Sequence, residues 1–167
     1  MIVIPQFDFG SVELFTVAEC REIRQNKIGS DDVLEHIQNS LMASVRYTDE
    51  LTLKWALFFH DIGKPSCIIE KNGHVHFYQH EIKGEELACK IIKRLKFSNK
   101  MQQDVSILIK NHMVAYSDSW TDGAVKRFIN RIGKERIQTL FYLQWSDQIA
   151  SEGISKEEQY QTFIKRI

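Results

Sequence analysis

Residues 51–65 read LTLKWALFFHDIGKP and join a strongly apolar helix to a charged end. Leu53 and Leu57 lie on one helical face, and aromatic side chains cover most of the remaining surface. A helix that is apolar nearly all round is expected to be central and buried. It leads into His60 and Asp61, and a buried carboxylate is costly unless it is paired or binds a metal. The stretch therefore predicts a buried helix that brings ionisable groups into the core.

Apolar residues at helical spacing also dominate the rest of the chain. Helices are expected at about 30–47, 49–60, 80–96, 98–113, 121–132, 134–150 and 155–166. The candidate N-caps of the first two are Ser30 with Asp31, and Thr48 or Asp49, and the second must end at Gly63 and Pro65. Residues 1–25 are ambiguous, with a short extended start and a helix expected around 11–24. About seven helices with short links predict an all-α fold in one compact domain, residues 1–167.

The segment CIIEKNGHVHFY, at about 67–78, breaks the helical pattern. Two short β-prone runs flank Asn72 and Gly73, a pair typical of tight hairpin turns. We expect a small hairpin or an irregular loop here. His74 and His76 alternate within the segment and are interpreted as surface or loop residues.

The composition argues against several classes of function. Lys plus Arg and Asp plus Glu number 22 each, so a general electrostatic attraction to nucleic acid or to an anionic membrane is not indicated. A basic strip is interpreted mainly as a solvated helix face, with a phosphate-tracking surface as the alternative; it comprises Lys90, Lys93, Arg94, Lys96 and Lys100. No GxGxxG, P-loop or GxSxG motif is present, which argues against dinucleotide-binding proteins and serine hydrolases.

Nothing in the sequence indicates a membrane or secretory protein. Every apolar run is shorter than the ~18 residues of a membrane span, and the opening MIVIPQFDF lacks the pattern of a signal peptide. Cys20, Cys67 and Cys89 have no paired spacing and are interpreted as small buried residues rather than disulfides or zinc ligands. We expect a cytoplasmic location and no membrane partner. The oligomeric state has no signature in the sequence.

Ionisable residues also fall on the inward faces of four other expected helices. His36 lies beside small side chains, His80 begins an apolar face, His112 ends one, and Asp147 lies near the end of a largely apolar helix. A single such histidine is more often a hydrogen-bonded core residue, but five helices that each present an ionisable group predict a shared site. Mixed His and Asp ligands suit Mn, Fe, Co, Ni or Zn better than Ca. Since clustered cysteines are absent, the predicted site is catalytic rather than structural zinc.

Seven short motifs occur in order between about residues 29 and 150: DVLEH, HDIGKP, HFYQHE, KFSNK, IKNHM, KRFINRIG and QWSDQIA. Together they resemble the HD domain of metal-dependent phosphohydrolases, in particular the HD domain attached to many bacterial tRNA nucleotidyltransferases. The first 25 residues match no motif of that domain. The Gly-Gly strand–turn and paired carboxylates of the nucleotidyltransferase head are absent, so we expect no nucleotide addition by this chain and no necessary link to tRNA.

The resemblance implies a set of metal ligands. A first ion would be held by His36, His60, Asp61 and Asp147. Members of the family with a second ion would add His80 and His112, with Asp61 bridging; without a second ion these two histidines would contact phosphate or donate protons. The expected cofactor is therefore one or two divalent ions, drawn from Mn, Fe, Co, Ni, Mg and Zn.

Three further residues are candidates for the chemistry. Lys64 lies about one turn beyond Asp61, and we expect it to bind phosphate rather than to be a surface lysine. Glu81 is a candidate proton shuttle, although a carboxylate favoured by the dipole of a helix N-terminus is an equal alternative. Arg127 is a weaker phosphate candidate and is more readily interpreted as a solvated helix residue.

The resemblance implies hydrolysis of phosphomonoesters or phosphodiesters by a metal-activated water. The expected substrate is a small phosphate ester or nucleotide, such as a 2′,3′-cyclic nucleotide or a nucleoside monophosphate. Two alternatives stay open. One is a nucleotide-binding or scaffold module with an inactive site, and the other is a hydrolase that processes RNA ends, which the balanced charge disfavours.

Overall fold

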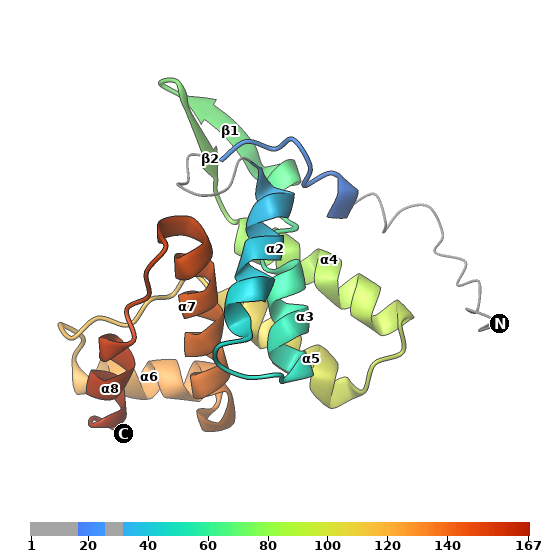
Figure 1. The fold of residues 1–167 in the computed structure, drawn as a ribbon. Coiled ribbons are helices and arrows are strands. Elements are labelled where there is room, and N and C mark those ends of the chain that lie inside the picture. Colours follow the sequence, from blue (N-terminus) through green and yellow to red (C-terminus); the bar gives the residue numbers. More distant parts are fainter. Residues whose placement is uncertain (1–16, 26–31) are drawn as a thin grey trace.

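The structure, a computed structural model, describes residues 17–25 and 32–167. Seven α-helices and a two-stranded antiparallel hairpin make up this part of the chain (Figure 1). The helices are α2 (Val33–Ser44), α3 (Leu51–Phe59), α4 (His80–Arg94), α5 (Asn99–Asn111), α6 (Asp122–Ile132), α7 (Ile137–Glu152) and α8 (Glu158–Ile164). Two 3-10 turns, η1 (Lys64–Cys67) and η2 (Lys134–Arg136), precede the hairpin and α7. The predicted mostly helical fold is confirmed.

Helix α3 lies at the centre of the domain and contacts α2, α5 and α7 (Figure 1). Leu53, Ala56 and Leu57 are completely buried, as the apolar character of the helix predicts. The helix ends at Phe59, and His60 follows as its C-cap. The end of this central helix therefore delivers the His60-Asp61 pair to the interior.

The predicted hairpin is present and begins directly after η1. Strand β1 (Ile68–Lys71) pairs with β2 (His74–Phe77), with Ile68 opposite Phe77 and Lys71 opposite His74. Asn72 and Gly73 connect them with φ angles of 54° and 76°. Two consecutive positive φ angles are what a type I′ hairpin turn requires, and Asn-Gly adopts them at low cost.

The helix expected at 11–24 is wrong in its second half, and residues 11–16 lie outside the described residues. Val17 and Ala18 are helical, but residues 19–22 form turns. Glu22 has a positive φ of 65°, and Arg24 forms an isolated bridge with Asp32. Because the Glu22 N–H donates to the Asp32 carboxylate (3.1 Å), the chain is drawn towards the start of α2 instead of continuing as a helix.

The helix caps differ from those expected. Asp32 caps α2 by accepting a hydrogen bond from the Glu35 N–H (2.8 Å), while Ser30 and Asp31 lie outside the described residues. Neither Thr48 nor Asp49 caps α3, because the Thr48 hydroxyl accepts from the N–H of Glu50, which is itself the N-cap. Within residues 17–25 and 32–167, no helix combines the length and the apolar character needed to cross a membrane.

Candidate metal centre

Six ionisable residues predicted to share a site converge in the structure. They are His36 on α2, His60 and Asp61 after α3, His80 at the start of α4, His112 at the C-cap of α5, and Asp147 on α7. They form two groups, His36 with His60 and Asp147, and Asp61 with His80 and His112, in which one possible ligand atom per residue lies within 4.8 Å of the others. Five of the six are buried, and the Asp147 side chain is 21% exposed. The five segments thus bring these polar side chains together within the apolar core of the domain.

Backbone carbonyls orient three of the four histidines. Nδ1 of His60 lies 2.7 Å from the Leu57 carbonyl, Nδ1 of His80 lies 2.8 Å from that of Phe77, and Nδ1 of His112 lies 2.7 Å from that of Ile109. A carbonyl oxygen only accepts hydrogen bonds, so Nδ1 must carry the proton in each ring. In the neutral tautomer Nε2 then has a free lone pair, which is the arrangement of a metal-binding imidazole.

The two oxygens of Asp61 serve different groups. Oδ2 lies 3.3 Å from Nε2 of His60 and 3.5 Å from Nε2 of His36. Oδ1 lies 3.3 Å from Nε2 of His80 and 3.9 Å from Nε2 of His112. Each oxygen therefore meets two imidazole nitrogens, and the carboxylate joins the two groups.

Asp147 closes the first group. Its Oδ1 lies 2.7 Å from Nε2 of His36 and 3.9 Å from Nε2 of His60. Its backbone carbonyl accepts a hydrogen bond from the hydroxyl of Ser151, one helical turn further along α7 (2.8 Å). Helix α7 thus places a carboxylate opposite the histidines that α2 and α3 supply.

The donor atoms fit a cation. The buried Nε2 of His60 makes no hydrogen bond to any described residue, although two carboxylate oxygens approach it. The Nε2 atoms of His80 and His112 lie only 3.2 Å apart. Two lone pairs repel at that distance unless a proton or a cation lies between them. Ligands of one transition-metal ion lie about 3–3.5 Å apart, because each bond is about 2.0–2.2 Å long, and most of the separations here match.

The electrostatics of the centre depend on opposing effects. Burial alone would raise the pKa of Asp61, but attraction to His60 and Lys64 outweighs it and holds that pKa well below its usual range. Burial opposes protonation of His60, yet the charges of Asp61 and Asp147 raise its pKa. Burial, followed by repulsion from His60, lowers the pKa of His112 to about 3. At neutral pH Asp61 is therefore ionised and His112 is neutral, which is the protonation state that each of these two residues needs as a metal ligand.

Lys64 is buried within this centre and is not a surface lysine. Its side chain is 5% exposed, and its Nζ contacts Oδ2 of Asp61 (2.5 Å) and Oε1 of Gln25 (2.8 Å). The same ammonium group lies 5.4 Å from the centre of the Phe77 ring. The amine thus lies between the metal-ligand candidates and the hairpin.

A close backbone contact sets the position of α4 relative to Asp61. A Cβ atom on Gly63 would lie 2.2 Å from the carbonyl oxygen of His80 and 2.5 Å from the amide nitrogen of Gly84. No side chain fits there, so glycine is required if the turn after Asp61 is to touch α4. This contact keeps His80 beside Asp61.

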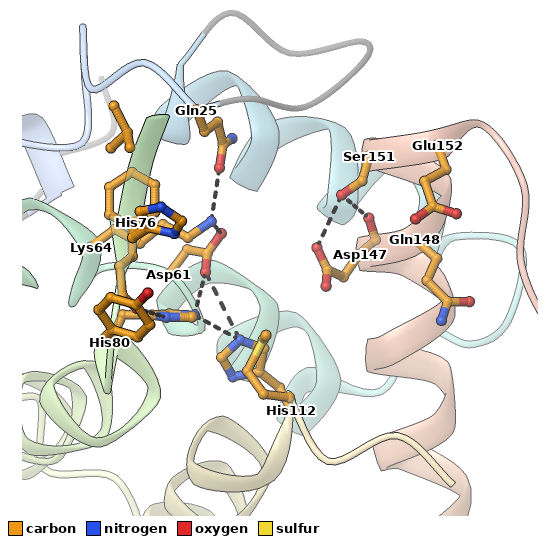
Figure 2. Close-up of a pocket in the computed structure, with 14 residues that line it drawn as sticks. Gln25, Asp61, Lys64, His76, His80, His112, Asp147, Gln148, Ser151 and Glu152 are labelled. Atoms are coloured by element: carbon orange, nitrogen blue, oxygen red, sulfur yellow. Dashed lines mark hydrogen bonds and ion pairs between the residues drawn. The ribbon is translucent and has the colours of Figure 1, made fainter. Parts of the chain in front are cut away.

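The centre opens into a pocket of about 650 Å³. Figure 2 shows Gln25, Lys64 and His76 on one side of it, Asp147, Gln148, Ser151 and Glu152 of α7 on the other, and His80 and His112 at the base. The interpretation of His76 as a surface or loop residue is incomplete, because it is half-buried and lines this pocket; His74 is exposed. Tyr78 and Met113 also line the pocket.

Sequence reasoning missed Gln25, His76 and the residues of α7 that follow Asp147. Ser151 lies four residues after Asp147 and so shares its helical face, which the sequence could have indicated. Gln25 meets Lys64 across 39 positions of sequence, in a segment without a recognised motif. No local pattern predicts a contact of that kind.

Two candidates lie away from the pocket. Arg127 is exposed on α6 and is not among the residues that line the pocket. Glu81 lies in the first turn of α4, with its carboxylate 3.8 Å from Nδ1 of His80, on the side of the ring that faces away from Asp61. That position agrees with the helix-dipole alternative for Glu81. The basic strip runs from α4 through the following loop to Lys100 in the first turn of α5, and it is exposed.

The three cysteines are thiols and do not form disulfides. Cys20 is completely buried, as expected, whereas Cys67 and Cys89 are half-buried. Burial, reinforced by the charge of Asp61, raises the pKa of Cys20 to about 12. This thiol therefore stays protonated and acts as a small apolar residue beneath the centre.

Comparison with known proteins agrees with this geometry. Residues 33–155 match the HD domain family, and this range contains all six candidate ligands. The chain is also 31% identical over 150 residues to an A-adding tRNA nucleotidyltransferase of Deinococcus radiodurans. That alignment covers 86% of this chain but 34% of the relative, so the chain spans about a third of the length of that protein. Members of the HD family bind divalent metals and are typically metal-dependent hydrolases. The chain belongs to the HD domain family.

Proposed function

We propose that this protein is a divalent-metal-dependent phosphohydrolase that cleaves small phosphate esters. The leading substrates are nucleotides, namely 2′,3′-cyclic nucleotides and nucleoside monophosphates. The observation that carries the proposal is the Asp61 carboxylate, which directs one oxygen to each of two histidine groups at the base of an open pocket.

The six candidate ligands divide naturally between two ions. His36, His60 and Asp147 with Oδ2 of Asp61 would hold one, and His80 and His112 with Oδ1 would hold the other. When bound, a divalent ion supplies Lewis-acid activation of water near neutral pH and offsets charge that develops on the phosphoryl group. Nitrogen and oxygen donors in this mixture suit Mn, Fe, Co, Ni or Zn, and Mg is also included in the proposal.

Lys64 has the role of binding the phosphoryl group. Its ammonium group reaches the pocket beside Asp61, and contacts with Gln25 and the Phe77 ring restrict its position. A cation held in a low-dielectric site interacts with an anion far more strongly than one in water. We propose that Lys64 shifts from Asp61 towards a phosphoryl oxygen when substrate enters.

The nucleotide-adding activity in the name of the relative belongs to a protein about three times as long as the shared region. Our proposal therefore concerns the hydrolytic domain alone. Small esters are favoured over RNA because basic and acidic residues are equal in number, whereas RNA binding generally depends on a surplus of basic charge.

The test is a panel of phosphate esters assayed with Mn, Ni, Co, Mg, Zn and anaerobic Fe. The panel includes 2′,3′-cyclic nucleotides, nucleoside monophosphates and simple sugar phosphates. We expect turnover of at least one nucleotide class, its loss with EDTA, and its recovery when metal is restored. Metal-independent activity, or none across the panel despite bound metal, would contradict the proposal and favour a binding module.

A further inference from the structure

The wall of the pocket formed by the hairpin carries two aromatic rings whose role the metal centre does not explain. His76 and Tyr78 line the pocket and stack on each other, with ring centres 5.5 Å apart and planes inclined by 9°. Tyr78 is 59% exposed, which leaves much of its surface open to a ligand. We call these two residues the aromatic shelf.

We propose that the aromatic shelf binds the aromatic part of the phosphate ester and makes the enzyme selective for nucleotides over esters without a base. The inference rests on the proposed function and extends it by assigning specificity to His76 and Tyr78. Flat rings held parallel at the rim of a pocket offer a stacking surface that a sugar phosphate alone cannot use.

The shelf is tied directly to the metal centre. In the sequence, Phe77 lies between His76 and Tyr78. The Phe77 carbonyl accepts the hydrogen bond that orients His80 (2.8 Å). The Phe77 ring lies 5.4 Å from the ammonium group of Lys64. A phosphoryl group at Lys64 and His80 would therefore have the shelf as an immediate neighbour for the rest of the ligand.

The other surfaces of the pocket suit the same kind of ligand. Met113 lines the pocket and is 58% exposed, so it offers a second, adaptable apolar surface. Gln148, Ser151 and Glu152 of α7 lie on the side opposite His76 (Figure 2). The charged residues at the bottom of the pocket suit an anionic phosphate, and the apolar surfaces at its rim suit a heteroaromatic ring. The polar groups of α7 suit the hydroxylated carbons that join the two.

The test compares the binding of two ligands that resist hydrolysis. These are the phosphonate analogues of adenosine monophosphate and of ribose 5-phosphate, in which a methylene group replaces the ester oxygen. Calorimetry on the whole chain with Mn²⁺ should show tighter binding of the adenosine compound by about tenfold, the lower part of the range for base–aromatic stacking. Tyr78→Ala should remove most of that preference, and Tyr78→Phe should retain it.

His74→Ala is the matched control, because His74 carries an exposed ring on the same strand as His76 but does not line the pocket. It should leave both affinities unchanged. Equal affinities in the wild type, an unchanged preference in Tyr78→Ala, or binding of neither analogue would each overturn the aromatic shelf. Loss of the proposed hydrolytic function would appear separately, as absence of metal-dependent turnover of the natural esters, whatever the ratio of these affinities.

Discussion

The Nε2 atoms of His80 and His112 face each other at 3.2 Å, although each ring donates its Nδ1–H to a backbone carbonyl. Both rings are buried, and the pKa of His112 is lowered to about 3, mainly by burial. Two such rings need a shared cation or proton between them. Oδ1 of Asp61 approaches the same point, so this pair is the strongest geometric argument for a second ion.

Replacement of His80 and His112 together by alanine tests the second ion. We expect bound metal to fall from about two ions per chain to one, and the rate of hydrolysis to fall steeply, because two-metal sites stabilise both the attacking and the leaving oxygen. Elemental analysis and steady-state kinetics are the measurements. Exposed His74→Ala is the control. If the double variant has the metal content and the rate of the wild type, both histidines have only a structural role.

Lys64→Met tests phosphate binding by the buried ammonium group. The substitution keeps the length of the side chain but removes its charge, so we expect KM for a phosphate ester to rise about tenfold or more, the effect of losing one charge-assisted hydrogen bond. Lys83→Met on α4, where the lysine side chain is 42% exposed, should behave as the wild type. An unchanged KM in Lys64→Met would show that Lys64 does not bind phosphate and serves only to neutralise the charge of Asp61.

Gly63→Ala tests the contact between the turn after Asp61 and α4. The added Cβ would meet the His80 carbonyl at 2.2 Å, so α4 must move, and we expect the free energy of unfolding to fall by about 1–3 kcal/mol. Urea denaturation provides the measurement. At Gly123 a Cβ would meet the end of the flexible Arg127 side chain at 3.4 Å and the Thr121 hydroxyl at 3.9 Å, so Gly123→Ala should change stability little. Equal stability of the two variants would rule out a tight contact.

Asp104 provides a prediction about pH that is independent of the metal. It receives hydrogen bonds from Arg136 Nε and Lys100 Nζ, each at 2.6 Å. Burial would raise its pKa, but these bonds outweigh burial and lower it. A depressed pKa in the folded state adds stability that is complete above the unfolded pKa of about 3.9 and is lost as pH falls through the folded pKa.

Asp104→Asn should therefore lower the free energy of unfolding by about 1–2 kcal/mol at pH 7. The difference from the wild type should shrink below about pH 4, where the unfolded carboxyl of aspartate takes up its proton. Chemical denaturation at several pH values measures it, with exposed Asp118→Asn as the control. A difference that stays constant down to pH 2 would show that ionisation of Asp104 contributes nothing.

The parts of the fold that follow from local periodicity could be predicted from the sequence. Helix α3 was identifiable because apolar residues cover nearly all of its surface, and the hairpin because Asn72-Gly73 suits its turn. The six candidate ligands were identifiable because each is an ionisable group on an apolar face or at its end. The clustering of those residues in the structure agrees with that interpretation.

The remaining features depend on contacts between distant segments. Residues 19–22 form turns instead of a helix because the Glu22 N–H donates to the carboxylate that caps α2. Gln25 meets Lys64 across 39 positions. His76 lines the pocket because β2 leads directly into His80 at the start of α4 and the Phe77 carbonyl accepts a hydrogen bond from that histidine, a geometry that alternation along one strand does not specify.

Metal content measured by elemental analysis after anaerobic reconstitution and removal of unbound ions tests the central claim most directly. The wild-type chain should retain about one to two divalent ions, and two if Asp61 joins two occupied groups. The His60→Ala plus Asp61→Ala variant should lose them, because it removes a ligand from each group and the carboxylate that they share. Circular dichroism should establish that this variant is folded. Equal metal content in the folded variant and the wild type, or no bound metal in either, would contradict the account.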